Sequence, residues 1–114
     1  MVLVIGGAGS GKLDYVKSLG YSAQEIADGL IDDRKVVYHL QNIVFDDPDR
    51  APELLGALLE KEVVVCDEVG SGIIPLSARE RQAREATGRL CIQLAKHASR
   101  VVRLVCGIPT VIKE

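Results

Sequence analysis

A glycine-rich run near the N-terminus, Gly6-Gly7-Ala8-Gly9-Ser10-Gly11-Lys12, contains the first residues whose types and spacing suit a chemical role. Glycines allow the backbone to wrap around a phosphate group with its N–H groups pointing inward, and a helix that follows adds its positive N-terminal end. Lys12 supplies a cation for the β- and γ-phosphates. The run predicts a loop that binds a nucleoside triphosphate, ATP or GTP; the alternative is a glycine-rich turn without a ligand.

The residue after the lysine departs from this pattern. A Ser or Thr at this position usually binds Mg²⁺ through its hydroxyl, and here the residue is Leu13. Leu13 can begin the helix and offer its backbone N–H to phosphate, but its side chain cannot ligate a metal. We therefore expect residues 6–13 to bind phosphate, whereas Mg²⁺ as a cofactor requires another ligand.

Two carboxylates follow the apolar run Val63-Val64-Val65-Cys66. An Asp at the end of a strand beside a phosphate-binding loop can hold Mg²⁺, directly or through water, and a neighbouring Glu can act as a base. We therefore expect Asp67 to be the metal ligand that makes up for Leu13, with Glu68 and Lys12 as catalytic residues. The alternative is an acidic pair that only caps and solvates the start of a loop.

Positive charge is concentrated between Ser77 and Arg103, where seven basic and two acidic residues give a net charge of +5 and leave −7 for the rest of the chain. Such a stretch is either a solvated face or a surface that faces an anion, with Arg81 and Arg84 as the candidate anion-binding residues. The acidic total of −2 and the lack of a recognition motif argue against a nucleic-acid partner.

Strands that alternate with helices must position these groups. The continuous apolar run at residues 2–5 is typical of a strand that is buried on both faces. Further strands are expected at 36–39, 63–66 and 101–106, with a short edge strand at 108–113, and loops at 45–49 and 67–76. Helices are expected at 13–19, at 22–28 with Ser22 and Glu25 as a capping box, at 49–61 with Asp49 as the cap, and at 77–99. This alternation predicts an α/β fold: one three-layer domain over residues 1–114 with a mostly parallel sheet.

The helix expected at 77–99 has one continuous apolar stripe, formed by Ala83, Ala86, Leu90 and Leu94. Ile92 and Ala95 lie on the opposite side, so the second half of the helix is apolar nearly all round. This pattern predicts a second buried contact, such as a subunit interface of a homo-oligomer. His97 falls within the main stripe and is expected to be a satisfied structural histidine.

Composition limits the remaining possibilities. The chain has 114 residues, of which 47% are apolar and 26% charged, as in ordinary soluble domains. Its apolar runs are too short to span a membrane, and the N-terminus does not read as a signal peptide. The three cysteines, Cys66, Cys91 and Cys106, are expected to be small buried residues in a reducing cytoplasm.

A longer motif suggests a family. Glu68-Val69-Gly70, Gly72-Ile73 and Pro75, followed by Arg81, Arg84, Gly88 and Arg89, resemble the adenosylcobinamide kinase / adenosylcobinamide-phosphate guanylyltransferase family of cobalamin biosynthesis. The glycine-rich run, Gly107 and Lys113 also fit that family. The resemblance implies a RecA-like P-loop sheet, ATP or GTP as substrate, a corrinoid (cobinamide) as acceptor and a propeller-like homotrimer.

The chain also departs from the family it resembles. The middle region, with the segment that supplies a guanylylated histidine, is largely missing, and Asp67 stands where the family has Asn. His39 is the candidate left in this region, but its neighbours Tyr38 and Leu40 do not match, and we expect it to be a strand-end residue. Three possibilities remain: a cobinamide kinase or guanylyltransferase, a degenerate member that binds nucleotide or corrinoid without catalysis, and another small-molecule P-loop kinase.

Overall fold

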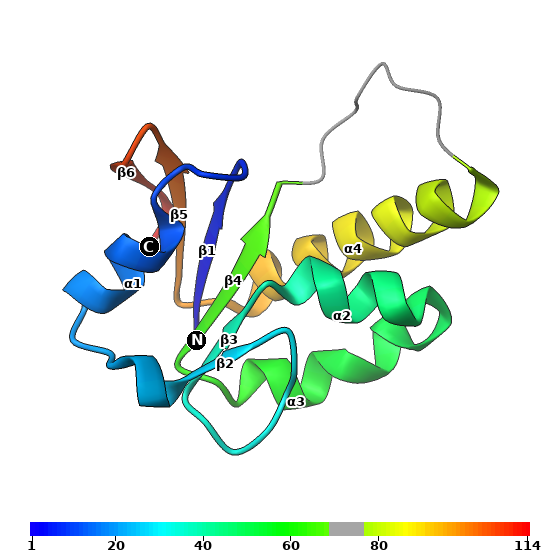
Figure 1. Ribbon diagram of the computed structural model, residues 1–114, viewed down its shortest axis with the longest axis horizontal. Coiled ribbons are helices and arrows are strands. Elements are labelled where there is room, and N and C mark those ends of the chain that lie inside the picture. The colour runs from blue at the N-terminus through cyan, green and yellow to red at the C-terminus, as the bar shows by residue number, and fades with distance from the viewer. Residues whose placement is uncertain (69–76) are drawn as a thin grey trace.

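A six-stranded sheet forms the centre of the computed structural model, which describes residues 1–68 and 77–114 (Figure 1). The strand order is β2-β3-β4-β1-β5-β6. All neighbouring strands are parallel except β5 and β6, which are antiparallel. The strands are β1 (Val2–Gly6), β2 (Ile26–Asp28), β3 (Val36–Tyr38), β4 (Val63–Asp67), β5 (Arg100–Val105) and β6 (Ile108–Lys113). The predicted α/β class with a mostly parallel sheet is confirmed.

Helices cover both faces of the sheet. On one face, Val16 of helix α1 (Lys12–Ser18) packs in a cluster with Val4 and Val65. On the other face, a second cluster joins Leu3 and Val64 to helices α2 (Leu40–Asp46), α3 (Leu55–Leu59) and α4 (Ala78–His97). Successive residues of β4 belong to opposite clusters, which explains its continuous apolar run. Each such buried side chain contributes about 1.5–3 kcal/mol.

The helix expected at residues 22–28 is wrong in its second half. The capping box of Ser22 and Glu25 is present, but it begins a single 3₁₀ turn, Ala23–Glu25. The chain then enters β2, where Ile26 and Ala27 are buried and pair in parallel with Val36 and Val37 of β3. Burial against the sheet therefore outweighs the local helix signal, because a capping box marks where a helix begins and not where it ends.

Two expectations about residues 40–61 are also wrong. The loop expected at 45–49 begins inside α2, which runs to Asp46 and is followed by a 3₁₀ segment, Pro48–Leu54. The single helix expected at 49–61 is divided into that segment and the short helix α3. Pro52 lies inside the 3₁₀ segment and has no N–H to donate. The Asp49 carboxylate accepts a hydrogen bond from Gln82 Nε2 of α4 at 2.6 Å.

The long helix α4 has the expected start and the expected stripe. Its N-cap is Ser77, whose hydroxyl accepts a hydrogen bond from the Glu80 N–H at 3.1 Å. The four predicted stripe residues are all buried. His97 has a hydrogen-bond partner, as expected, because its Nδ1 lies 2.9 Å from the Gln93 carbonyl oxygen, but its place in the apolar stripe is wrong, since the residue is exposed in the last turn. Ile92, on the side of the helix opposite the stripe, is 56% exposed and is not covered by another part of the described chain.

The cysteines differ in burial. Cys66 is buried, Cys91 is half-buried and Cys106 is exposed, so the expectation of three buried cysteines is wrong for Cys106. The neighbouring Cys91 thiol, together with burial, raises the pKa of the Cys66 thiol. Cys106 occupies a turn between β5 and β6 with a φ of 51°.

No helix within residues 1–68 and 77–114 combines the length and the apolar character that crossing a membrane would require.

Candidate functional site

The glycine-rich loop lies at the carboxyl edge of the parallel strands. It connects the end of β1 to the start of α1, and the neighbouring strand β4 ends beside it at Asp67. After β1 the chain crosses one face of the sheet through α1 toward β2, and after β4 it crosses the opposite face through α4 toward β5. The crevice between β1 and β4 is therefore a topological switch point, where α/β sheets bind ligands.

The loop requires glycine at two positions for separate reasons. Gly11 has a φ of 92°, a left-handed conformation that side chains disfavour. At Gly6, a Cβ atom would lie 2.5 Å from Ser10 Oγ and 2.8 Å from the Leu104 carbonyl oxygen. The Gly107 N–H donates to the Ser10 carbonyl at 2.9 Å, so the turn between β5 and β6 supports the loop from behind. The glycine spacing thus serves the shape of the loop as well as access to its backbone.

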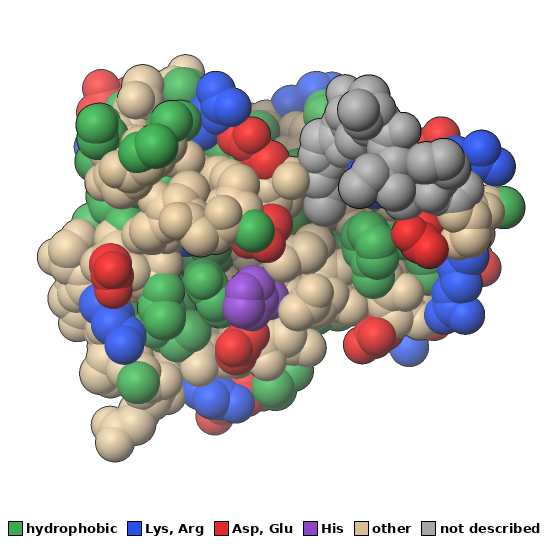
Figure 2. Space-filling view, turned by 45° about the horizontal axis from the view of Figure 1, so that its top comes forward, with side chains coloured by type: hydrophobic (Ala, Val, Ile, Leu, Met, Phe, Trp, Pro, Cys, Tyr) green, Lys and Arg blue, Asp and Glu red, His purple; other side chains and the backbone are tan. Residues whose placement is uncertain are grey.

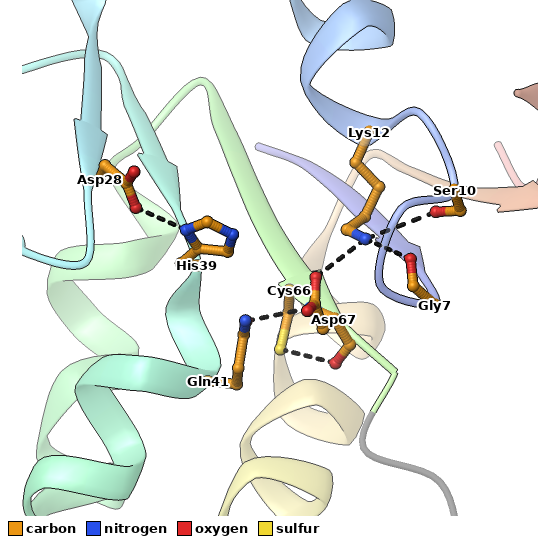
Figure 3. Close-up of polar contacts among 8 residues, drawn as sticks. All are labelled: Gly7, Ser10, Lys12, Asp28, His39, Gln41, Cys66 and Asp67. Carbon is orange, nitrogen blue, oxygen red and sulfur yellow. Dashed lines mark hydrogen bonds and ion pairs between the residues drawn. The ribbon is translucent and has the colours of Figure 1, made fainter.

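Lys12 crosses beneath the loop (Figure 3). Its side chain is 2% exposed, and its Nζ lies 2.8 Å from Asp67 Oδ1, 2.6 Å from the Gly7 carbonyl oxygen and 3.4 Å from Ser10 Oγ. An ammonium has three N–H donors, and a buried one needs acceptors for them. The loop, the first residue of α1 and the end of β4 therefore meet at one cation, a contact between Lys12 and Asp67 that was not predicted from the sequence.

Asp67 is held from the other side by α2. Its backbone N–H donates to Oε1 of the buried Gln41 at 3.0 Å, while the Cys66 thiol donates to the Asp67 carbonyl oxygen at 3.3 Å. The Asp67 side chain is 23% exposed, so one edge of the carboxylate remains accessible beside Lys12. The position of this carboxylate is thus fixed by three elements: β4, α1 and α2.

The donor set limits how Mg²⁺ could bind. Leu13 packs against the core cluster that contains Val4 and Val16, and its side chain offers no oxygen. Among the residues that the structure describes, no group of three or more His, Cys, Asp or Glu side chains could hold a metal. Mg²⁺ usually keeps several waters and takes one or two carboxylates together with phosphate oxygens. Asp67 therefore fits a metal ion that arrives with a triphosphate, not one caged by protein alone.

Glu68 faces β5. Its carboxylate accepts two hydrogen bonds from Arg103, at 2.5 Å from Nε and 3.1 Å from Nη2, and this contact raises the pKa of the Arg103 guanidinium. The Glu68 N–H donates to the Gly6 carbonyl at 2.8 Å. The side chain is therefore close to the loop, but both carboxylate oxygens face a guanidinium.

The structure does not bring Arg81 and Arg84 to the loop. Both lie in the first two turns of α4, and Figure 1 shows this end of α4 far from the loop that follows β1. Arg81 is exposed and Arg84 is half-buried. The motif that carries the family resemblance includes residues 69–76, which lie outside the described part of the chain.

Sequence reasoning missed a second polar group at the same edge of the sheet. His39 follows β3, and its Nδ1 lies 2.6 Å from Asp28 Oδ1 at the end of β2. Figure 2, in which this edge comes forward, shows a histidine near the centre of the face with acidic side chains above and below it. The available signal was a polar residue directly after a buried strand, the same signal that indicated Asp67. His39 is at the strand end, as expected.

Comparison with protein families gives one match, the model described as Cobinamide kinase / cobinamide phosphate guanyltransferase, over residues 44–112. The matched range includes β4, α4, β5 and all but the last residue of β6, and it begins after the glycine-rich loop and His39. A search of curated proteins found no match. The family match thus rests on residues 44–112, and the glycine-rich loop lies outside it.

Proposed function

The chain belongs to the cobinamide kinase / cobinamide phosphate guanyltransferase family, and from this we propose that it binds a nucleoside triphosphate at residues 6–13 and transfers a phosphoryl or nucleotidyl group to a cobinamide-type corrinoid. One observation carries the proposal: the buried Lys12 ammonium beneath a glycine-rich loop at the switch point of the sheet. A buried, mobile cation at this place suits the terminal phosphates of a nucleotide.

In this proposal each residue of the site has a defined task. Phosphate oxygens replace Gly7 and Ser10 as acceptors for the Lys12 N–H groups, which at present are all directed at protein oxygens. Asp67 keeps Lys12 in place and turns its accessible edge toward the phosphates. Mg²⁺, when bound, would neutralise charge on the β- and γ-phosphates, with Asp67 as its protein ligand.

A second candidate function, binding without catalysis, is favoured by Leu13. Its side chain is part of the packing beneath α1, so the hydroxyl ligand of related loops has been replaced by a core contact. The two candidates share nucleotide binding and differ in transfer. A third, another small-molecule kinase, differs only in the acceptor.

Titration calorimetry with ATP and with GTP, each with and without Mg²⁺, tests binding. We expect Lys12→Ala to weaken triphosphate binding about 10- to 150-fold, which corresponds to about 1.5–3 kcal/mol for a charge-assisted contact. Lys17→Ala is the matched control, because Lys17 is an exposed lysine in the last turn of the same helix. No binding of either triphosphate by the unmodified protein would contradict the proposal.

Transfer is measured separately, with radiolabelled ATP or GTP and cobinamide as the acceptor. Labelled cobinamide phosphate or guanylylated product supports the enzyme. Binding without any labelled product supports the binding protein, and a labelled product with a different alcohol but not with cobinamide supports the third candidate.

We also propose that the protein forms a homo-oligomer, a trimer as the family resemblance implies. The support is Ile92, an exposed apolar side chain on α4 beside a groove of about 540 Å³ that is lined by Pro52, Leu55 and Leu90, among others. An exposed apolar patch of this kind is typical of an interaction surface. Sedimentation that gave only a 12.3 kDa species at micromolar concentration would contradict this proposal.

A further inference from the structure

His39 and Asp28 form a pair at the ends of two neighbouring strands. The Nδ1 atom of His39, after β3, lies 2.6 Å from Oδ1 of Asp28, the last residue of β2. The His39 side chain is 32% exposed and the Asp28 side chain 65% exposed. A carboxylate that accepts a hydrogen bond from Nδ1–H holds the imidazole in the tautomer whose Nε2 carries a lone pair.

The backbone at His39 is unusual. Its φ of 58° and ψ of 49° are left-handed, a conformation that residues other than glycine, asparagine and aspartate rarely adopt. Val36 and Tyr38 pack in the cluster beneath α1, and Val37 packs in the cluster beneath α2, α3 and α4. Because side chains alternate along a strand, an extended residue 39 would point to the same face as Val37. The left-handed turn stops this alternation and leaves the ring at the edge of the sheet, against Asp28. Strain of this kind is characteristic of functional positions.

The free nitrogen of His39 faces the phosphate-binding side of the molecule. Figure 3 shows Nδ1 directed at Asp28 and the second ring nitrogen directed away from it, to the side of Asp67 and Lys12. Within residues 1–68 and 77–114, no hydrogen bond occupies Nε2. The adjacent Tyr38 ring lies 4.0 Å from the imidazole, measured between centroids. Burial raises the pKa of the Tyr38 phenol, and the charges of Asp67, Asp28 and Asp14 raise it further, so these groups share one neighbourhood.

The other acidic groups of this edge are already engaged. The Asp67 carboxylate contacts Lys12, and both oxygens of Glu68 face Arg103. At the end of β3, the imidazole of His39 therefore offers a ring nitrogen that is directed at the site and has no cation as partner among the described residues. This is the property that a general base needs.

We propose that His39 is the general base of the transfer reaction, acting on the acceptor's hydroxyl group, and that Asp28 is its positioning residue. This inference rests on the function proposed above. The hydroxyl proton moves to His39 Nε2 while the hydroxyl oxygen bonds to the γ-phosphorus. The bond from that phosphorus to the β,γ-bridging oxygen breaks, and the nucleoside diphosphate leaves. The imidazolium, stabilised by the Asp28 carboxylate, later releases the proton to water. The acceptor is thus an alcohol seated between His39 and the loop.

The variant His39→Asn tests this assignment, because asparagine tolerates the left-handed conformation and has no basic nitrogen. We expect the rate of transfer to fall about 10²- to 10⁴-fold, the usual range for loss of a general base. Triphosphate affinity by calorimetry and the melting temperature should stay at their unmodified values. His97→Asn is the matched control, since His97 is exposed at the far end of α4 and should leave transfer unchanged.

The outcomes separate this inference from the proposed function. If the unmodified protein binds no triphosphate, the proposed function fails and the inference fails with it. If the unmodified protein binds triphosphate but transfers nothing, the transfer part of the proposed function fails and the inference fails with it. If the unmodified protein transfers and His39→Asn transfers at the same rate, the inference alone is overturned. A melting temperature that falls in His39→Asn together with triphosphate affinity would instead assign His39 a structural role.

Asp28→Asn tests the positioning role. The groups that face His39 are Asp28 from β2, Tyr38 from β3 and Asp67 from β4, with Asp14 of α1 near the Tyr38 phenol. Loss of the Asp28 charge should lower kcat less than His39→Asn does and leave KM for the triphosphate unchanged. A kcat that stays at the unmodified value, or a KM that rises as kcat falls, overturns the role of Asp28. Asp33→Asn, at an exposed aspartate near the same edge strands, is the control.

Discussion

Asp67 and Glu68 are neighbours in the sequence, yet their carboxylates form two very different ion pairs. Asp67 contacts the Lys12 ammonium, which is 2% exposed, whereas Glu68 contacts the Arg103 guanidinium, which is 51% exposed. The pair with more hydrogen bonds is the exposed one. Water already solvates half of the Arg103 side chain, whereas the Lys12 side chain is shielded from water and depends on protein oxygens. Burial of the partner therefore decides how much each carboxylate matters to the fold and to the site.

The largest expected effect comes from Asp67→Ala. This change leaves the Lys12 ammonium buried without its carboxylate, and breaking such a pair costs about 3–5 kcal/mol when both partners are buried. Because Asp67 is 23% exposed, we expect the lower end, about 3 kcal/mol, in the free energy of unfolding. Urea denaturation followed by circular dichroism measures it. A loss no larger than that of Glu68→Ala would show that the two pairs are equivalent.

An intermediate effect is expected on the binding of metal and nucleotide. Asp67→Asn keeps an oxygen acceptor for Lys12 and removes the ligand charge. If Asp67 replaces the hydroxyl that is missing at Leu13, Mg²⁺ should strengthen triphosphate binding, and Asp67→Asn should remove a gain of about 1.5–3 kcal/mol, the range of a charge-assisted contact. Calorimetry with and without Mg²⁺ measures this difference.

Leu13→Thr sharpens the same test in the opposite direction. If the protein binds nucleotide without using Mg²⁺, the added hydroxyl should introduce a magnesium dependence that the unmodified protein lacks. If the unmodified protein, Asp67→Asn and Leu13→Thr all depend on Mg²⁺ to the same extent, neither position 13 nor position 67 is a ligand of the metal.

The smallest effect is expected for Glu68→Ala. Exposed ion pairs contribute about 1 kcal/mol or less to stability, and salt screens them. The difference in unfolding free energy between Glu68→Ala and the unmodified protein should therefore shrink further in 1 M NaCl, where the Debye length is about 3 Å. The corresponding difference for Asp67→Ala should persist. Denaturation curves at low and high salt make the comparison; two differences that shrink alike would contradict it.

The buried centre of the sheet could be predicted because its strands consist of uninterrupted valine-rich runs. Asp67 was expected near the glycine-rich loop as a metal ligand, but its ion pair with Lys12 was not predicted, because the order of the strands does not follow from the runs themselves. Edge strand β2 was missed because only Ile26 and Ala27 are buried in it, and two residues show no periodicity. The Asp28–His39 pair depends on β2 lying beside β3, so it was missed with the strand.

Other errors came from packing that a local pattern does not contain. Helix α2 contains Ile43, Val44 and Phe45, which are residues of modest helix propensity, and it is stabilised by burial of Leu40 and Val44. The buried Gln41 gave no sign of its contact with the Asp67 N–H. The charge excess of the first α4 turns was correctly located, but charge alone does not tell where a helix end lies relative to a loop 70 residues away in sequence.

The hydrogen bond from the Gly107 N–H to the Ser10 carbonyl couples the C-terminal hairpin, β5 and β6, to the glycine-rich loop. β6 is the exposed edge of the sheet, and edge elements with few buried contacts open at low free energy. A ligand that restricts the motion of the glycine-rich loop should also restrict the turn between β5 and β6. Amide hydrogen exchange at Gly107 should therefore slow when a triphosphate binds, although the hairpin itself contributes no ligand to it. Exchange at the turn beside edge strand β6 would thus report whether a triphosphate occupies the glycine-rich loop.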